Sequence, residues 1–285
     1  MAFDNKKIPA DLIEHFKKGQ GIFFVGAGLS MGAGYPSWAG LLNGLIKEAK
    51  KQPWVNKDKI KDYEKLIKDS SKFLFIAEDL KTELGKTFYD YMDKIFADTK
   101  KEPTEAHELL VKINPSLIIT INYDDLIEKA YNNVYGDYPN AFSYSQSREA
   151  ANNFWQDKFF ILKAHGDAKR DVTSLILSQK DYRKILYRET GYRSLLQAIF
   201  TIKSIVFLGV SFNDPEFNQL LDYLHDSYHG GGPIHYLLTD EEAVNNTLAR
   251  RYKEDFNIFT IAADNSKKDY TYIVSFLKYL YKTIK

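Results

Sequence analysis

Glycines and polar side chains that can do chemistry stand directly after four short apolar segments of this 285-residue chain. In chain order they are Gly26–Ser30, Asn122–Asp125, His165–Gly166 and Gly209–Ser211. Small residues let a main chain approach a pyrophosphate and donate its N–H groups to the phosphate oxygens. A carboxamide both donates and accepts hydrogen bonds, and an imidazole moves protons near neutral pH. Together these residue types favour a site that binds a phosphate-bearing ligand and transfers a proton.

Each segment also has a purely structural interpretation. Glycine-rich turns often only connect a strand to a helix, Asn and Asp often cap the next helix, and an isolated histidine is more often structural than catalytic. The five other histidines fit that interpretation, since they fall in predicted helices, near a helix end or inside a strand. For the four segments the functional interpretation is favoured, because all four would meet at one edge of a single sheet.

The elements that must position these residues follow from the apolar pattern. Short, nearly continuous apolar runs predict strands over Gly21–Val25, Leu117–Ile121, Phe159–Lys163, Ser204–Leu208, Ile234–Leu238 and Asn257–Ile261. Longer amphipathic stretches predict helices over Ser37–Lys50, Asp124–Tyr131, Asp214–Tyr228 and Asp269–Thr283. This alternation predicts an α/β fold, a Rossmann-like doubly wound parallel sheet. Such sheets bind ligands beyond the carboxyl ends of their strands, where the four segments stand.

One stretch departs from the alternation. Residues from about 53 to 98 have helical spacing throughout, with Phe73, Ile76, Ala77, Leu80 and Leu84 on one face. We therefore expect a single domain over residues 1–285, with a helical insertion at about 53–98 that packs beside the sheet.

Composition excludes several classes of function. The net charge of +1 provides no strong field for nucleic acid or for an anionic membrane, and no apolar run is long enough to span a bilayer. We expect a cytoplasmic protein that contacts neither. The chain has no cysteine, which excludes disulfides, cysteine nucleophiles and cysteine-ligated zinc. No spaced set of His and carboxylate residues is present either, so we expect no metal.

Two short motifs match a serine hydrolase. Gly28–Gly32 has the G-x-S-x-G spacing of a nucleophile elbow, and His229–Gly232 has the HGGG sequence of an oxyanion loop. The elbow requires a helix that begins at the serine, whereas the capping residue Ser37 comes seven positions later. The HGGG sequence also follows the serine, although hydrolases place it before. Both points disfavour a hydrolase of that type.

The motifs GAGLS…GYPSW, ITINYDDLIE, LKAHG and FLGVSFNDP, spread from Gly21 to about Leu224, resemble the bacterial sirtuin-like domains. The resemblance implies a Rossmann-like sheet that binds NAD⁺, with chemistry at the bond between nicotinamide and ribose. It implies that Asn122 and His165 are catalytic, with His165 as general base. The cofactor-binding residues that it implies are Gly26, Ala27, Gly28, Ser30, Asp124, Gly209 and Ser211.

Two departures narrow the resemblance. Protein-deacylating sirtuins carry a four-cysteine zinc module, which this chain lacks. They also have an arginine at their phosphate loop, whereas the corresponding segment here, Tyr35–Ala39, has none. The sequence is more similar to sirtuin-like NAD⁺-consuming effectors of bacterial anti-phage defence, which share the PSW, NYD and SF-x-DP elements. That resemblance implies an NAD⁺ glycohydrolase that releases nicotinamide and ADP-ribose and depletes cellular NAD⁺. The alternatives are an NAD-dependent protein deacylase and a non-catalytic NAD-binding regulatory module.

An enzyme that consumes a central cofactor must be controlled. The helical insertion is placed where it can cover the site, and the 20 Tyr and 19 Phe residues can form an oligomer interface. We expect partners beyond NAD⁺, namely further copies of the chain in a homo-oligomer, a sensor or activator protein, or both.

Overall fold

A seven-stranded parallel sheet forms the centre of the computed structural model, which describes residues 4–97, 100–210, 221–222, 225–226, 231–266 and 270–285. The strand order is β3-β4-β2-β1-β5-β6-β7, and every paired strand runs parallel to its neighbour. The strands are β1 (Gly21–Val25), β2 (Ile118–Thr120), β3 (Ala141–Ser143), β4 (Ile161–Lys163), β5 (Ser204–Leu208), β6 (His235–Asp240) and β7 (Ile258–Ala263).

The α/β doubly wound fold predicted from the sequence is confirmed. All six predicted strands are present, with β1 and β5 at the predicted bounds and the others shifted by one or two residues. The sequence did not predict β3, a three-residue edge strand that pairs only with β4. Of the helix predicted over Asp214–Tyr228, most positions lie outside the described residues.

Alternate side chains of each strand enter two separate cores, which is why the strands have continuous apolar sequences. Phe23 and Val25 pack on one face with α1 (Ala10–Lys17), α7 (Glu105–Lys112), α8 (Leu126–Tyr135) and α14 (Thr271–Ile284). Ile22 and Phe24 pack on the other with α9 (Ser147–Trp155), α10 (Gln179–Arg188), α11 (Thr190–Ile202) and α13 (Asn246–Phe256). Burying a large apolar side chain in this way contributes about 1.5–3 kcal/mol.

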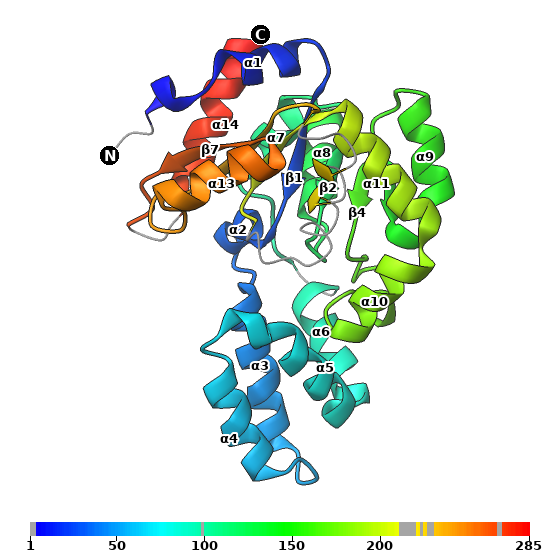
Figure 1. Ribbon diagram of the computed structural model, residues 1–285. Coiled ribbons are helices and arrows are strands. Elements are labelled where there is room, and N and C mark those ends of the chain that lie inside the picture. The colour runs from blue at the N-terminus through cyan, green and yellow to red at the C-terminus, as the bar shows by residue number, and fades with distance from the viewer. Residues whose placement is uncertain (1–3, 98–99, 211–220, 223–224, 227–230, 267–269) are drawn as a thin grey trace.

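A group of four helices, here called the helical lobe, has a core of its own. It consists of α3 (Trp38–Lys51), α4 (Lys57–Leu66), α5 (Phe73–Leu84) and α6 (Lys86–Phe96). The hydroxyl of Ser37 caps α3 by accepting a hydrogen bond from the Gly40 N–H at 3.1 Å. The lobe core also includes Tyr123 and Leu177, which follow β2 and β4, so the lobe lies beyond the carboxyl ends of the strands (Figure 1). The division of the chain into domains stays a prediction.

The order in which the strands are added to the sheet reverses at β1. Strands β2, β4 and β3 lie on one side of β1, and β5, β6 and β7 lie on the other. This reversal opens a crevice at the carboxyl end of β1, where doubly wound sheets place their ligands. Among the described residues, no helix is long and apolar enough to cross a membrane.

Candidate active site

A cavity of about 650 Å³ occupies this crevice, between the sheet and the helical lobe. Its volume is in the range of small-molecule and cofactor sites. The residues predicted from the sequence that line it are Ala27, Gly28, Ser30, Asn122, Asp124, His165 and Gly209. Gly26 is not among the lining residues but accepts a hydrogen bond from Asn122, and Ser211 lies outside the described residues. The structure therefore brings together residues from the ends of β1, β2, β4 and β5, as the sequence predicted.

Three glycines bring the loop after β1 and the loop after β5 into main-chain contact. The Gly28 N–H donates to the Gly209 carbonyl oxygen at 3.0 Å. A Cβ atom on Gly28 would lie 2.7 Å from the Gly209 Cα, and one on Gly26 would lie 2.6 Å from the Gly209 oxygen. Gly209 itself has a φ of +62°, which other residues rarely adopt. This glycine contact fixes the wall of the cavity with main chain alone.

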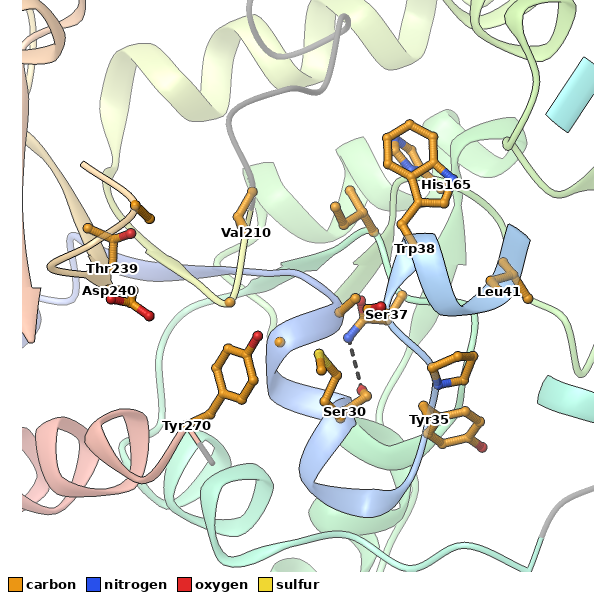
Figure 2. A pocket seen from close by; sticks show the side chains of 18 of the residues that line it. Ser30, Tyr35, Ser37, Trp38, Leu41, His165, Val210, Thr239, Asp240 and Tyr270 are labelled. Carbon is orange, nitrogen blue, oxygen red and sulfur yellow. Dashed lines mark hydrogen bonds between the residues drawn. The ribbon is translucent and has the colours of Figure 1, made fainter. Parts of the chain in front are cut away.

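A chain of hydrogen bonds joins three of the predicted residues. The Asn122 side-chain nitrogen Nδ2 donates to the Gly26 carbonyl oxygen and to the Ser30 Oγ, both at 3.0 Å, and Figure 2 shows the bond to Ser30. Asp124 lines the same cavity, and interaction with the Ser30 hydroxyl lowers the pKa of its carboxyl group. Because both amide hydrogens of Asn122 are used within the protein, its Oδ1 is oriented as an acceptor for a hydroxyl or a water in the cavity.

The Asp124 carboxyl group is buried at the beginning of α8. Its Oδ1 accepts a hydrogen bond from the Leu126 N–H at 3.1 Å. Burial raises the pKa of Asp124, while the positive charge of Lys163 and the hydrogen bonds from Leu126 and Ser30 oppose that rise. The protonation of Asp124 therefore depends on its hydrogen-bond partners.

His165 lies at the end of β4, only 3% exposed, with its ring edge-on to the Tyr182 ring at 5.3 Å. Main-chain hydrogen bonds tie its loop to the loop after β2, since Ala164 N–H donates to Thr120 O at 2.8 Å and Ala168 N–H donates to Tyr123 O at 3.2 Å. The imidazole is thereby held over the same cavity as Asn122 and Asp124.

The sequence interpretation missed the far end of the cavity. Thr239 and Asp240 terminate β6 and line the cavity together with Tyr270. Figure 2 shows these three residues on the opposite side of the view from His165 and Trp38. Thr239 and Asp240 directly follow the predicted strand Ile234–Leu238, so the rule applied to the other four strand ends would have found them. Tyr182 and Trp38 come from helices, and no strand-end signal marks them.

The structure also corrects one reason given against a serine hydrolase. A one-turn helix, α2 (Ala27–Ser30), begins directly after β1, whereas the sequence placed the first helix only at Ser37. Ser30 nevertheless has an ordinary helical conformation, with φ −82° and ψ −13°, and not the strained turn of a nucleophile elbow. Its hydroxyl accepts a hydrogen bond from the Asn122 side chain. Of the HGGG sequence, His229 and Gly230 lie outside the described residues.

The lining of the cavity carries no positive side chain among the residues that the structure describes, and its acidic members are Asp124 and Asp240. Within the same ranges, no three His, Asp or Glu side chains are arranged to hold a metal ion. A bound anion would therefore depend on main-chain N–H groups in this part of the wall.

Comparison with known proteins adds a family match. The model of the SIR2-like domain family matches residues 116–261. Defense-associated sirtuin 2 of Bacillus subtilis is 27% identical over 270 residues, covering 92% of this chain and 25% of that protein. NAD(+) hydrolase ThsA of Enterococcus faecium is 28% identical, covering 99% of this chain and 60% of that protein. The ThsA of Bacillus cereus is 29% identical, covering 77% and 43%. The chain thus spans between a quarter and three fifths of these curated relatives.

Proposed function

This chain belongs to the SIR2-like domain family, and from that premise we propose that it is an NAD⁺ hydrolase, which cleaves NAD⁺ to nicotinamide and ADP-ribose. Relatives over most of the chain are named NAD(+) hydrolase. The observation that carries the proposal is the hydrogen-bonded pair Asn122–Ser30, which lines one cavity together with Asp124 and His165.

The chemistry suits these side chains. In NAD⁺ the nicotinamide ring carries a positive charge, and it becomes neutral nicotinamide when its bond to ribose breaks. Its departure therefore needs little acid assistance. The ribose that remains acquires oxocarbenium character, which positioned acceptors and negative charge stabilise. We assign Asn122 Oδ1 to a ribose hydroxyl or the attacking water, because the two donors of its amide are already bound to Gly26 and Ser30.

His165 is assigned as the general base that takes the proton from the attacking water or from a ribose hydroxyl. Asp124 is assigned to the nicotinamide ribose and its pocket. Its ionised form provides the negative charge beside the developing cation, and the Ser30 hydroxyl favours that form. Every one of these groups is supplied by the protein, so the step needs no metal.

The remainder of the dinucleotide extends from this end of the cavity toward Asp240. The main chain of Gly26, Ala27 and Gly28 borders the pyrophosphate, and Gly209 borders the adenosine, as the resemblance implies; Ser211 is assigned there as well. Asp240 and Thr239 accept hydrogen bonds from the adenosine ribose. This assignment is supported because an acidic side chain next to a ribose accepts hydrogen bonds from the ribose hydroxyls. The described lining residues include no cation that would pair with the acid instead.

The biological role that we propose is defence against phage by NAD⁺ depletion in the cytoplasm, ending in abortive infection. The support is that relatives are named defense-associated sirtuin and NAD(+) hydrolase. Control would act through a homo-oligomer or a sensor or activator protein, with the helical lobe covering the cavity.

The decisive experiment incubates the full chain with NAD⁺ at several protein concentrations, with an acetyl-lysine peptide and with or without EDTA. We expect equal amounts of nicotinamide and ADP-ribose, an intact peptide and no effect of EDTA. Nicotinamide release coupled to loss of the acetyl group would identify a deacylase. NAD⁺ that is bound at every concentration without being consumed would identify a regulatory module.

A test in cells separates the biological role from the chemistry. When its trigger is present, the wild-type protein should lower NAD⁺ and stop growth, and the His165→Ala variant should do neither. Equal toxicity of the two proteins would contradict NAD⁺ depletion as the cause.

A further inference from the structure

Lys163 is a fully buried lysine in contact with Asp124, and neither the sequence motifs nor the proposed chemistry gives it a role. It is the last residue of β4, two positions before His165. Its ammonium nitrogen Nζ lies 2.6 Å from the Asp124 carbonyl oxygen, 3.0 Å from Glu128 Oε1 and 3.4 Å from Asp167 Oδ1.

These three contacts reach different segments of the site. Asp124 belongs to the loop after β2, Glu128 to the first turn of α8, and Asp167 to the turn that follows His165. A lysine ammonium is a compact charge with three donors, which suits contacts in three directions. The Lys163 side chain therefore crosses from the His165 segment to the Asn122–Asp124 segment.

Stability alone does not account for this arrangement. Removing charges from water is costly, and apolar side chains of similar volume are often equally stable in such places. Within the described part of the chain, the second carboxylate oxygen of Glu128, Oε2, is buried without a hydrogen bond. A buried oxygen without a hydrogen bond costs stability.

A second buried lysine provides the contrast. Lys203 lies at the opposite edge of the sheet, next to the first residue of β5, and its Nζ donates to the Gly19 carbonyl oxygen at 3.1 Å. It closes a turn and joins no catalytic segments.

We propose that Lys163 is a positioning residue, which holds the His165 segment and the Asn122–Asp124 segment at a fixed separation. This inference rests on the proposed NAD⁺ hydrolase function. A displacement of about 1 Å between groups that act together can lower a rate about 100-fold, while the binding of a long dinucleotide elsewhere in the cavity changes little. The signature is therefore a fall in kcat at nearly constant KM.

The experiment compares purified full-length Lys163→Met/Glu128→Leu, Lys163→Arg and Lys203→Met with the wild type. The double variant replaces the buried ion pair by apolar side chains, and Lys203→Met is the matched control. We expect the double variant to keep its melting temperature within a few degrees, to lose at least 30-fold in kcat and to change KM less than threefold. Lys163→Arg keeps the charge and should recover part of that loss, remaining about fivefold below the wild type.

Each result bears on the proposal. A folded double variant with kcat within threefold of the wild type would overturn it, and so would an equal loss of kcat in Lys203→Met. If the double variant fails to fold, Lys163→Arg decides, because a kcat equal to that of the wild type would contradict positioning by this side chain. Failure of the wild type itself to cleave NAD⁺ would instead refute the proposed function.

Discussion

The two ends of the parallel strands, here called the carboxyl edge and the amino edge of the sheet, satisfy their buried polar groups in different ways. At the carboxyl edge, side chains bond to other side chains as well as to main chain, as Asn122 does to Ser30 and Lys163 does to Glu128. At the amino edge they bond to main chain, since Ser204 Oγ donates to Ile234 O at 2.5 Å and His235 Nδ1 accepts from the Ile205 N–H at 3.2 Å.

The cavities follow the same division. The carboxyl edge borders about 650 Å³, whereas the cavity beside His235 at the amino edge holds about 60 Å³. At the amino edge, the bonds to main chain close the strand ends and leave little room. At the carboxyl edge, the added bonds between side chains orient groups around a space, which is the arrangement that a site needs. Variants at matched positions of the two edges can test whether this difference is functional.

The largest effect is expected from the histidine and asparagine of the carboxyl edge. His165→Ala and Asn122→Asp should each lower the rate of NAD⁺ cleavage by roughly 10²–10⁴-fold. Asn122→Asp keeps the shape but removes both donors and places a carboxylate against the Gly26 carbonyl oxygen. Circular dichroism checks the fold, and His235→Asn is the control, which should cleave at the wild-type rate. A folded variant that keeps more than about a tenth of the activity would contradict the assigned role.

A smaller effect is expected from Ser30, which accepts a hydrogen bond from Asn122 and lowers the pKa of Asp124. Ser30→Ala should lower kcat about tenfold. It should also move the acid limb of the pH–rate profile to higher pH, because the lost hydrogen bond favoured the ionised carboxylate and its removal raises the pKa of Asp124 further. Ser204→Ala at the amino edge should change neither quantity. An acid limb that does not move in Ser30→Ala would show that Asp124 ionisation does not govern the rate.

Asp240 should affect binding and not the chemical step. Asp240→Ala removes the acceptor at the far end of the cavity and should raise KM for NAD⁺ roughly tenfold with kcat unchanged. Asp240→Asn keeps an oxygen that can accept the Glu242 N–H, so it should raise KM less. Initial rates over a range of NAD⁺ concentrations separate the two constants. A fall in kcat alone would contradict the assignment of Asp240 to binding of the adenosine ribose.

The amino edge should affect stability without affecting the rate. Burial lowers the pKa of His235 from 6.5 to about 4, so between those values the unfolded chain binds more protons than the folded one. Stability from this group is therefore present at pH 7 and is lost as pH falls toward 4, with a loss of about 2 kcal/mol at pH 5. Urea unfolding at pH 7 and pH 5 should show a smaller difference for His235→Asn. An unchanged difference would show that His235 does not titrate on unfolding.

The sequence predicted the site where apolar strands end in polar residues. Phe23 and Phe24 marked a strand buried on both faces, and the residues after four such strands do meet at one cavity. The edge strand β3 was missed because three residues paired on one side carry too little apolar signal. Lys163 was missed for a different reason, since a lysine at the end of a strand normally reaches solvent, and only the fold encloses it among carboxylates.

The glycine contact also sets the time at which the cavity can exist during synthesis. Gly28 must meet Gly209, and β1 must pair with β5, roughly 180 residues later in the chain. Ribosomes add about 5–20 residues per second, so the first glycines emerge roughly 10–40 s before their partner. Until then β1 lacks the neighbour that completes its side of the crevice, and long-range parallel pairing is intrinsically slow. A nascent chain therefore has no assembled wall around Asn122 and His165, and a ribosome-bound fragment ending before Gly209 should leave NAD⁺ intact.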